Sequence, residues 1–257
     1  LRVTAAATPD VYDYHVHSTY SDGSFLEWMV GAASDAGFDG VGIADHCVVT
    51  PTEAARSHRR LMGFNLDETY ERRREAIRKL DDNHEITVFD AVELDYHPGH
   101  ESAMQAFLSS AGFDYAIGSV HELDGANVHD AAHFAEKTDT ECERLVDRYF
   151  EKLVALAESE LFEIVAHPDL IERNPQLRGY ATDDQYERAA TAFADSRTVP
   201  ETNAGRTTRA FGSSPPTTAF RRAPHPARAL STPGTARHDP AVPAQPAEAT
   251  SPPRARA

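Results

Sequence analysis

Residues 13–24 are Asp13-Tyr14-His15-Val16-His17-Ser18-Thr19-Tyr20-Ser21-Asp22-Gly23-Ser24, and the architecture of the chain can be worked out from this segment. Apolar and polar residues alternate over residues 11–17, which predicts a β-strand. Because residues two apart on a strand share a face, His15 and His17 project side by side. Asp22 adds a carboxylate, so the three could hold a divalent cation. Two histidines at this spacing also occur by chance, so a metal site depends on what other strands supply.

The rest of the chain alternates between predicted strands and helices about six times. Further strands are expected at residues 40–46, 86–94, 113–121, 161–169 and 198–203. Helices are expected at residues 25–33, 67–80, 100–109, 140–158 and 183–194; the 67–80 helix is strongly charged and the 140–158 helix is long and amphipathic. This alternation predicts an α/β fold around a parallel sheet, either open or closed into a barrel.

Metal-binding residue types stand where the predicted strands end. These residues are His15, His17, His46, Glu93, His121 and His167. The carboxyl ends of parallel strands are where such folds place their chemistry, so we expect one shared site. Imidazole and carboxylate ligands suit Zn²⁺, Mn²⁺ or Fe²⁺, and the lack of thiolates argues against a structural zinc site. The ligands outnumber the needs of one ion, which predicts at least two metals and favours phosphate-ester hydrolysis.

Composition limits the partners and the compartment. The 257 residues have a formal net charge of −16, which argues against nucleic acid as a partner. No apolar run is long enough to span a membrane, the first ten residues do not resemble a secretory signal, and two cysteines are too few for a disulfide framework. We therefore expect a cytoplasmic protein. Only three residues are lysine, and such an acidic, lysine-poor chain suggests adaptation to high salt, so full stability at low KCl would contradict that hypothesis.

The last fifth of the chain has a different composition. Residues 206–257 contain eight arginines, two acidic residues and ten of the 16 prolines. The segment therefore carries +6, which leaves −16 − 6 = −22 on residues 1–205. Such a segment cannot form a packed core, so we expect a domain at residues 1–205 and a disordered tail at residues 206–257. The tail is either an ordinary proline-rich ending or, the interpretation we favour, out-of-frame sequence.

The ordered motifs resemble the polymerase-and-histidinol-phosphatase (PHP) superfamily. They are H-x-H-S-x-x-S-D-G, an Asp-His pair at 45–46, a strand-end Glu, Val120-His121 and Ala166-His167-Pro168-Asp169. Residues 118–125 and the long helix before His167 resemble the histidinol-phosphatase branch. The resemblance covers residues 11–205 and implies a distorted (β/α)₇ barrel.

The resemblance also implies roles for individual residues. His15 and His17 would hold a first metal, and Glu93 would bridge it to a second. His121 and His167 would complete the second metal site. Asp22 and His46 would hold a third metal. The implied cofactors are two or three divalent ions (Zn, Mn or Fe), with Glu93 and His121 at the catalytic centre. The implied reaction is hydrolysis of L-histidinol phosphate, a small phosphorylated substrate, to L-histidinol and phosphate.

One motif of the family is missing. Members are expected to end with a strand carrying G-x-D-x-H, but no Asp-x-His follows Asn203. The pattern stops where the composition changes, which is why we favour the out-of-frame interpretation. Two alternatives to a histidinol phosphatase stay open: a phosphoesterase acting on another phosphomonoester, a nucleotide or an oligonucleotide, and an inactive truncated or frame-shifted chain.

Several other residues have less definite roles. Arg173 could clamp a phosphate through its guanidinium, or be an ordinary surface arginine. Asp45 is expected to orient His46, and Cys47 to be a small buried residue. Four histidines in polar surroundings are expected to be solvated rather than ligands: His97, His100, His129 and His133.

Overall fold

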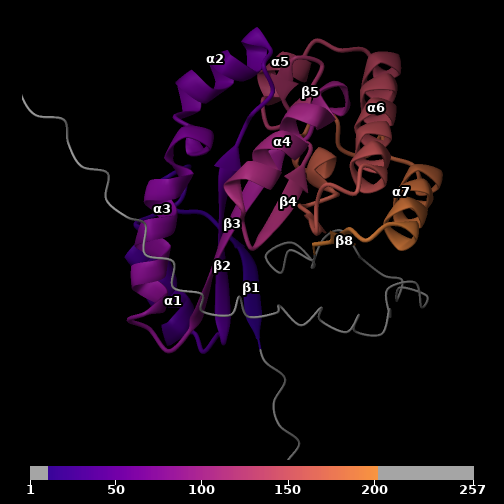
Figure 1. The fold of residues 1–257 in the computed structure, drawn as a ribbon. Coiled ribbons are helices and arrows are strands. Elements are labelled where there is room, and N and C mark those ends of the chain that lie inside the picture. The colour runs from indigo at the N-terminus through magenta and orange to yellow at the C-terminus, as the bar shows by residue number, and fades with distance from the viewer. Residues whose placement is uncertain (1–10, 202–257) are drawn as a thin grey trace, which may run out of the picture. The chain divides into compact units, whose positions relative to one another are not determined.

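The computed structural model describes residues 11–201, the side chains of residues 54, 58 and 61 excepted, and its centre is a curled parallel sheet. In spatial order the strands are β1 (Tyr12–Val16), β2 (Gly40–Cys47), β3 (Thr87–Asp95), β4 (Tyr115–Ser119), β7 (Ile164–Val165) and β8 (Val199–Pro200). All neighbours pair in parallel, so the carboxyl ends meet at the upper edge in Figure 1. Within residues 11–201 the sheet is an open half-barrel with β1 and β8 as its edges. This confirms the predicted α/β class with a curled parallel sheet, and a seventh strand would fall outside the described residues.

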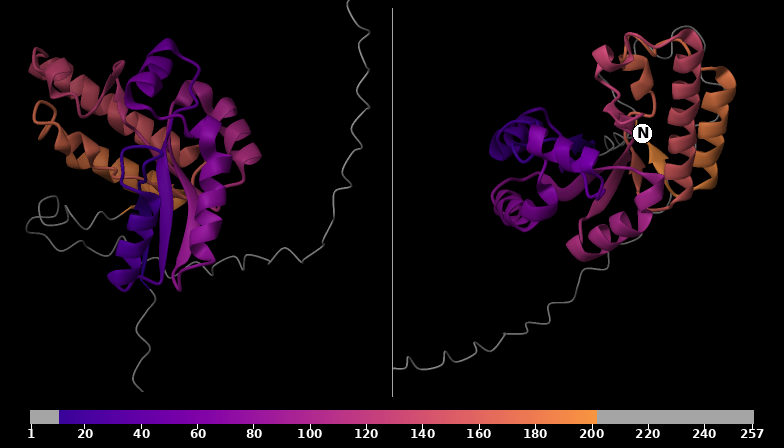
Figure 2. Two further views of the ribbon diagram at one scale, coloured as in Figure 1. Left: turned by 90° about the vertical axis from the view of Figure 1, so that its left-hand side faces the viewer. Right: turned by 90° about the horizontal axis from the view of Figure 1, so that it is seen from above.

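The segments between the strands carry most of the helices. The helices are α1 (Leu26–Asp35), α2 (Glu53–Met62), α3 (Leu66–Asp81), α4 (Glu101–Ala111), α5 (Ala131–Phe134), α6 (Asp139–Glu158) and α7 (Asp183–Asp195), with 3₁₀ turns at Pro98–His100 and Leu170–Arg173. They surround the outer side of the sheet, and α6 and α7 lie side by side (Figure 2). None of the described helices is long and apolar enough to cross a membrane.

Three local features differ from the sequence-based expectations. Helix α2 was not among the predicted helices, although Thr52 caps it by accepting a hydrogen bond from the Ala55 N–H and Gly63 ends it in the left-handed conformation. A short antiparallel hairpin, β5 (Glu122–Leu123) and β6 (Ala126–Asn127), follows β4 and was not predicted. The strand expected at residues 161–169 is only β7, because the chain turns away from the sheet before His167.

The outer side of the sheet is held by apolar packing. Helix α6 begins with a capping box, in which Thr138 and Glu141 each bind the backbone N–H of the other, and its buried face packs into the largest core cluster. Val16, Val41 and Ile43 from β1 and β2 pack with residues of α1 and α3 in a second cluster. These contacts fix the strands whose upper ends carry the candidate site.

Strand β1 contains a bulge that sets which side chains face inward. Asp13 pairs with Val41 and Val16 with Ile43, so β1 has one residue more than β2 over this interval. As a result Tyr14 and His15, although adjacent, both face the inner side of the sheet. The Tyr14 ring lies 6.0 Å from that of Phe89, and His15 lies 3.2 Å from Glu93, four residues further along β3.

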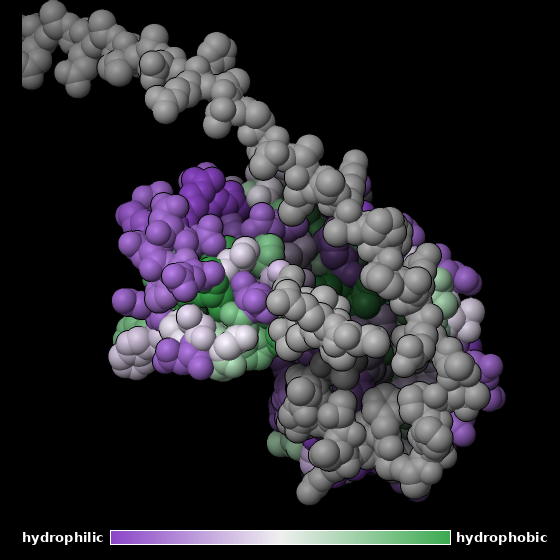
Figure 3. Space-filling model, turned by 90° about the horizontal axis from the view of Figure 1, so that it is seen from below, coloured by the Kyte–Doolittle hydropathy of each residue, from purple (hydrophilic) through white to green (hydrophobic). Residues whose placement is uncertain are grey.

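Aromatic rings line the inner side below the candidate site. We call Tyr12, Tyr14, Phe89 and Tyr115 the aromatic floor; their ring centroids lie 5.6–6.2 Å apart. The Tyr115 hydroxyl crosses β2 and donates a hydrogen bond of 2.6 Å to the Tyr14 carbonyl. A Cβ at Gly42 would lie 1.6 Å from that hydroxyl oxygen, so only glycine leaves room for the crossing. Seen from the amino ends of the strands, the described surface has a hydrophobic centre beside a hydrophilic flank (Figure 3).

Candidate metal centre

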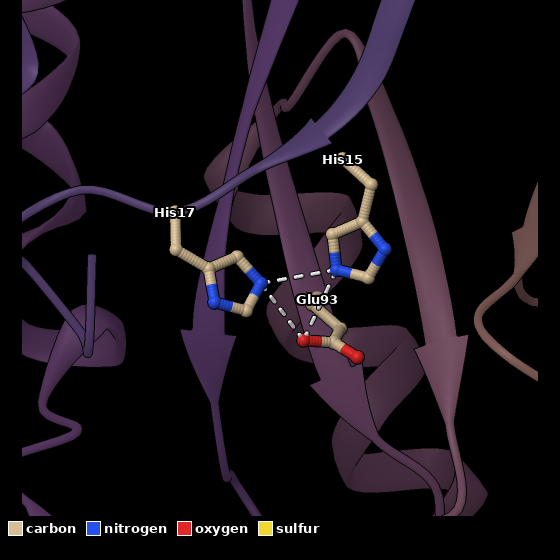
Figure 4. A group of neighbouring side chains, drawn as sticks. All are labelled: His15, His17 and Glu93. Atoms are coloured by element: carbon tan, nitrogen blue, oxygen red, sulfur yellow. Dashed lines mark hydrogen bonds and ion pairs between the residues drawn. The ribbon is translucent and has the colours of Figure 1, made fainter. Parts of the chain in front are cut away.

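Five imidazoles surround the carboxylate of Glu93, which is fully buried at the upper end of β3. Its Oε2 lies 3.2 Å from Nε2 of His15, 3.2 Å from Nε2 of His17 and 2.7 Å from Nδ1 of His46. Its Oε1 lies 3.1 Å from Nε2 of His167 and 3.5 Å from Nε2 of His121. The structure therefore brings together five histidines from four separate segments around one acid. Figure 4 shows His15, from β1, and His17, directly after β1, projecting toward Glu93.

Asp22 extends the cluster on the side of β1 and β2. Its Oδ1 lies 2.6 Å from Nδ1 of His17, and its Oδ2 lies 3.6 Å from Nε2 of His46. The side chain is half exposed, whereas the histidines are mostly buried. Asp22 is thus the ligand candidate that faces solvent most directly.

The donor atoms form three overlapping groups that suit divalent cations. The groups are His15/His17/Glu93, His17/Asp22/His46 and His46/Glu93/His121, and within each the ligand atoms lie within 4.8 Å of one another. Imidazole nitrogens with carboxylate oxygens are a ligand set for Zn²⁺, Mn²⁺ or Fe²⁺. Because His17, His46 and Glu93 each belong to two groups, the geometry fits neighbouring ions that share ligands. His167 contacts Glu93 but belongs to none of the three groups.

Charge interactions and hydrogen bonds in the metal-free cluster raise the pKa of three imidazoles, those of His15, His17 and His46. Burial lowers the pKa of His15, but the charge of Glu93 and hydrogen bonds with Glu201 and Glu93 outweigh it and raise the pKa to about 10. The pKa of His46 is also about 10, because Glu93 and Asp22 outweigh burial there. Burial raises the pKa of Glu93, but the nearby imidazolium charges hold it well below its usual value. Cations would take the place of these protons.

Two carboxylates behind the histidines were not identified from the sequence. Glu201, which follows β8, places Oε2 2.6 Å from Nδ1 of His15. Asp95 accepts a hydrogen bond of 2.9 Å from the His121 N–H and lies 3.5 Å from its Nδ1. Carboxylates of this kind fix the orientation of a ligand ring and raise its basicity. In the sequence, both carboxylates stand at the ends of strands, as the predicted metal ligands do, and this position could have identified them.

The role expected for Asp45 was wrong. Its side chain does not orient His46, because adjacent residues on a strand point to opposite faces. Instead the fully buried Asp45 carboxylate faces the helices, where it accepts hydrogen bonds from Ser18, Ser21 and Arg73. Cys47, by contrast, is free and buried, as predicted.

His167 has an unusual backbone and a cationic neighbour. Its φ is +28°, a conformation that side-chain-bearing residues seldom adopt, and the Tyr149 hydroxyl donates to the Pro168 carbonyl, 3.2 Å away, to hold this turn. Burial lowers the pKa of His167, and the positive charge of half-buried Arg173 lowers it further. Arg173 lies at the end of the 3₁₀ turn Leu170–Arg173, which follows His167 in the chain.

The four histidines expected to be solvated lie outside the three donor groups. His129 and His133 are exposed. His97 and His100 are half-buried rather than solvated, with ring centroids 4.7 Å apart, and Nδ1 of His97 accepts a hydrogen bond from the Gly99 N–H.

Comparisons with known proteins concern the family and the fold. A family profile described as PHP domain matches residues 13–204. A curated protein of Deinococcus radiodurans, described as a probable histidinol-phosphatase, is 28% identical over 163 residues, which are 62% of this chain and 60% of that protein. The chain thus spans about three fifths of the length of that relative.

Two solved structures share the fold. The histidinol phosphate phosphatase HISK of Lactococcus lactis, crystallised with zinc, L-histidinol and phosphate, superposes with a TM-score of 0.55 at 21% identity, covering 72% of this chain and 68% of that one. The hisK protein of Listeria monocytogenes, a histidinol phosphatase candidate, gives a TM-score of 0.59 at 18% identity, covering 72% and 79%.

Proposed function

The chain belongs to the PHP domain family, and on that premise we propose that it is a metal-dependent phosphatase that hydrolyses L-histidinol phosphate to L-histidinol and phosphate. The observation that carries the proposal is the ring of five imidazoles around the buried Glu93 carboxylate, with Asp22 beside it. The Deinococcus relative, named for histidinol phosphatase activity, supports the choice of substrate.

Two or three divalent ions (Zn, Mn or Fe) would be held by the strand-end side chains. These are His15, His17, Asp22, His46, Glu93, His121 and His167. When bound, such ions supply positive charge for the phosphoryl oxygens and allow water to act as a nucleophile at neutral pH. In the overall reaction water adds to phosphorus, the ester P–O bond breaks, and the alcohol leaves with a proton.

The chain's own residues have separate tasks in this proposal. Glu93 and His121 lie at the centre of the cluster, where the carboxylate of Glu93 balances the charge of whatever cations it holds. Arg173 would bind the substrate, because a guanidinium can donate two parallel hydrogen bonds to phosphoryl oxygens. Its electrostatic influence on His167 supports a place at the edge of the site.

We also propose the conditions in which the protein works, namely the cellular compartment and the salt concentration. Cys47 and Cys142 are both free and buried, in keeping with a reducing cytoplasm. The net charge of −16 with few lysines fits a protein that works in high salt, to be tested by following unfolding from low to molar KCl. The proposed tail boundary at residues 205–206 and the missing G-x-D-x-H motif lie outside the described residues.

The test is a substrate comparison with purified protein and Mn²⁺ or Zn²⁺. We expect phosphate release from L-histidinol phosphate with a kcat/KM at least tenfold above that for p-nitrophenyl phosphate, and no cleavage of a short oligonucleotide. Exclusive oligonucleotide cleavage would reject the proposal. Metal binding without any hydrolysis would favour the inactive-chain alternative.

Matched variants connect the activity to the cluster. Glu93→Gln and His121→Ala should each lower kcat/KM by at least about 100-fold, because a bridging or central ligand is lost. His133→Ala, which changes an exposed histidine outside the donor groups, should leave kcat/KM within about twofold. Equal losses in His121→Ala and His133→Ala would show that the cluster is not the active site.

A further inference from the structure

The loop that carries Asp22 is tied to a buried ion pair on the far side of the sheet. Asp45 lies on β2 and Arg73 on α3, and neither side chain has exposed surface. Nη1 of Arg73 donates a hydrogen bond of 2.8 Å to Oδ2 of Asp45. Nη2 of Arg73 donates one of 2.6 Å to Oδ1 of Asp90, and Arg73 also contacts the carbonyls of Ile43 and Ala91. The guanidinium is thus fixed between β2 and β3.

Asp45 connects the fixed guanidinium to the loop through hydrogen bonds. Its Oδ1 accepts hydrogen bonds from the Ser18 N–H (2.6 Å) and the Ser21 hydroxyl (2.8 Å), and its Oδ2 accepts one from the Ser18 hydroxyl (2.8 Å). The Ser18 carbonyl in turn accepts from the N–H groups of Ser21 and Gly23, 3.0 Å each. Both neighbours of Asp22 are therefore held: Ser21 is held by Asp45, and Gly23 by the Ser18 carbonyl.

The same strand presents the partner of Asp22 on its other face. His46 follows Asp45 directly, and its imidazole points inward to Asp22 and Glu93 while Asp45 points to the helices. One segment of β2 therefore sets both the position of His46 and the position of the loop opposite it. Asp22 is half exposed, and apart from the held loop its carboxylate is restrained by Nδ1 of His17, 2.6 Å from its Oδ1.

From these contacts we propose that Arg73 and Asp45 are positioning residues for the donor group His17/Asp22/His46. They hold residues 18–23 so that the Asp22 carboxylate is presented to the cation shared with His46. This inference rests on the metal centre of the proposed function. It assigns control over the position of one metal ligand to a buried ion pair on the helix side of the sheet.

The experiment titrates Mn²⁺ into the metal-stripped full chain and follows binding by calorimetry. Asp22→Ala should lose one class of bound Mn²⁺ and retain the rest. Arg73→Lys and Asp45→Asn should weaken that same class by about ten- to hundredfold, as loss of an outer partner of a metal ligand does. Arg74→Lys is the matched control: Arg74 is the next residue of α3 and binds Asp90 (2.5 Å) rather than Asp45, so this variant should bind Mn²⁺ like the unmodified chain.

A double-mutant cycle separates positioning from general stability. In the Asp22→Ala background, Arg73→Lys should have no further effect on Mn²⁺ binding, because the carboxylate that it positions is gone. Ser21→Ala removes a single hydrogen bond to Asp45 and should weaken the same class of Mn²⁺ binding about threefold. If circular dichroism shows that the charge variants do not fold, this variant tests the proposal in their place.

The outcomes distinguish the two proposals. Unchanged Mn²⁺ binding in Arg73→Lys, or an effect that persists in full in the Asp22→Ala background, overturns the positioning role and leaves the metal centre intact. If the unmodified chain binds no Mn²⁺, the metal centre and the positioning role fail together.

Discussion

Gly23 determines how closely the Asp22 loop approaches the end of β1. A Cβ at this position would lie 2.0 Å from the His17 carbonyl oxygen and 2.6 Å from the Ser18 nitrogen. Both are backbone atoms, so Gly23→Ala cannot be accommodated by a side-chain rotation. Restoring van der Waals contact requires the loop to move by more than about 1 Å.

The cost of that movement can be worked out from the bonds it breaks. The Gly23 N–H donates to the Ser18 carbonyl at 3.0 Å, and Asp22 lies 2.6 Å from Nδ1 of His17. A neutral hydrogen bond contributes about 1 kcal/mol and one to a charged group about 1.5–3 kcal/mol. Since Asp22 is half exposed, we take the lower end for the second. Gly23→Ala should therefore reduce the free energy of unfolding by about 2–3 kcal/mol.

Urea unfolding of the metal-free chain, followed by circular dichroism, measures this quantity. Gly31→Ala provides a control of opposite sign, because position 31 lies inside α1 and a Cβ there has no neighbour within 4 Å. Replacing a helical glycine by alanine should stabilise the chain by up to about 1 kcal/mol. A Gly23→Ala variant within about 0.5 kcal/mol of the unmodified chain would refute the close approach of the loop.

Four other predictions follow from the same structure. In the metal-free chain the pKa of His15 and of His46 is raised from 6.5 to about 10. The stability that their protons provide is therefore fully present below pH 6.5 and is lost as the pH rises to about 10. Urea unfolding across this range should show the decline, and Glu93→Gln should remove most of this pH dependence. Addition of Mn²⁺ at 100 times its Kd should raise the free energy of unfolding by about 2.7 kcal/mol, and EDTA should reverse the gain in the same urea titration. Glu201→Gln should weaken Mn²⁺ binding by about tenfold in calorimetry, since it removes the charge behind His15, whereas the exposed Glu187→Gln should not. Thr138→Ala should cost about 1 kcal/mol through loss of the α6 capping box, visible as a Tm lower by about 2–4 °C, and an unchanged Tm would contradict the cap.

The sequence was sufficient to predict the sheet and the place of its candidate ligands. Parallel strands bring their carboxyl ends to one edge, so residues as distant as His15 and His167 could be grouped without knowledge of the exact packing. The side-by-side orientation of His15 and His17 followed from strand periodicity alone, and the structure places their Nε2 atoms 3.0 Å apart.

What could not be predicted depends on contacts between distant segments. The role of Asp45 is set by Ser18 and by Arg73 on α3, and no local pattern around β2 reveals either partner. Glu201 required the position of β8 relative to β1, which lies at the opposite edge of the sheet. Helix α2 was missed for a different reason: its Thr52 and Gly63 capping signals were present, but most of its ten residues are polar or charged, which is also typical of a loop.

The bulge in β1 has a consequence for which mutations this strand can tolerate. It joins two alternating patterns that are out of phase by one residue, with Tyr12 and Tyr14 inward before the shift and His15 inward after it. A regular strand could turn only one of these sets inward. Loss or gain of one residue would therefore reassign the inward faces, whereas a substitution leaves the phase intact. Strand β1 should tolerate many changes of side chain but few changes of length.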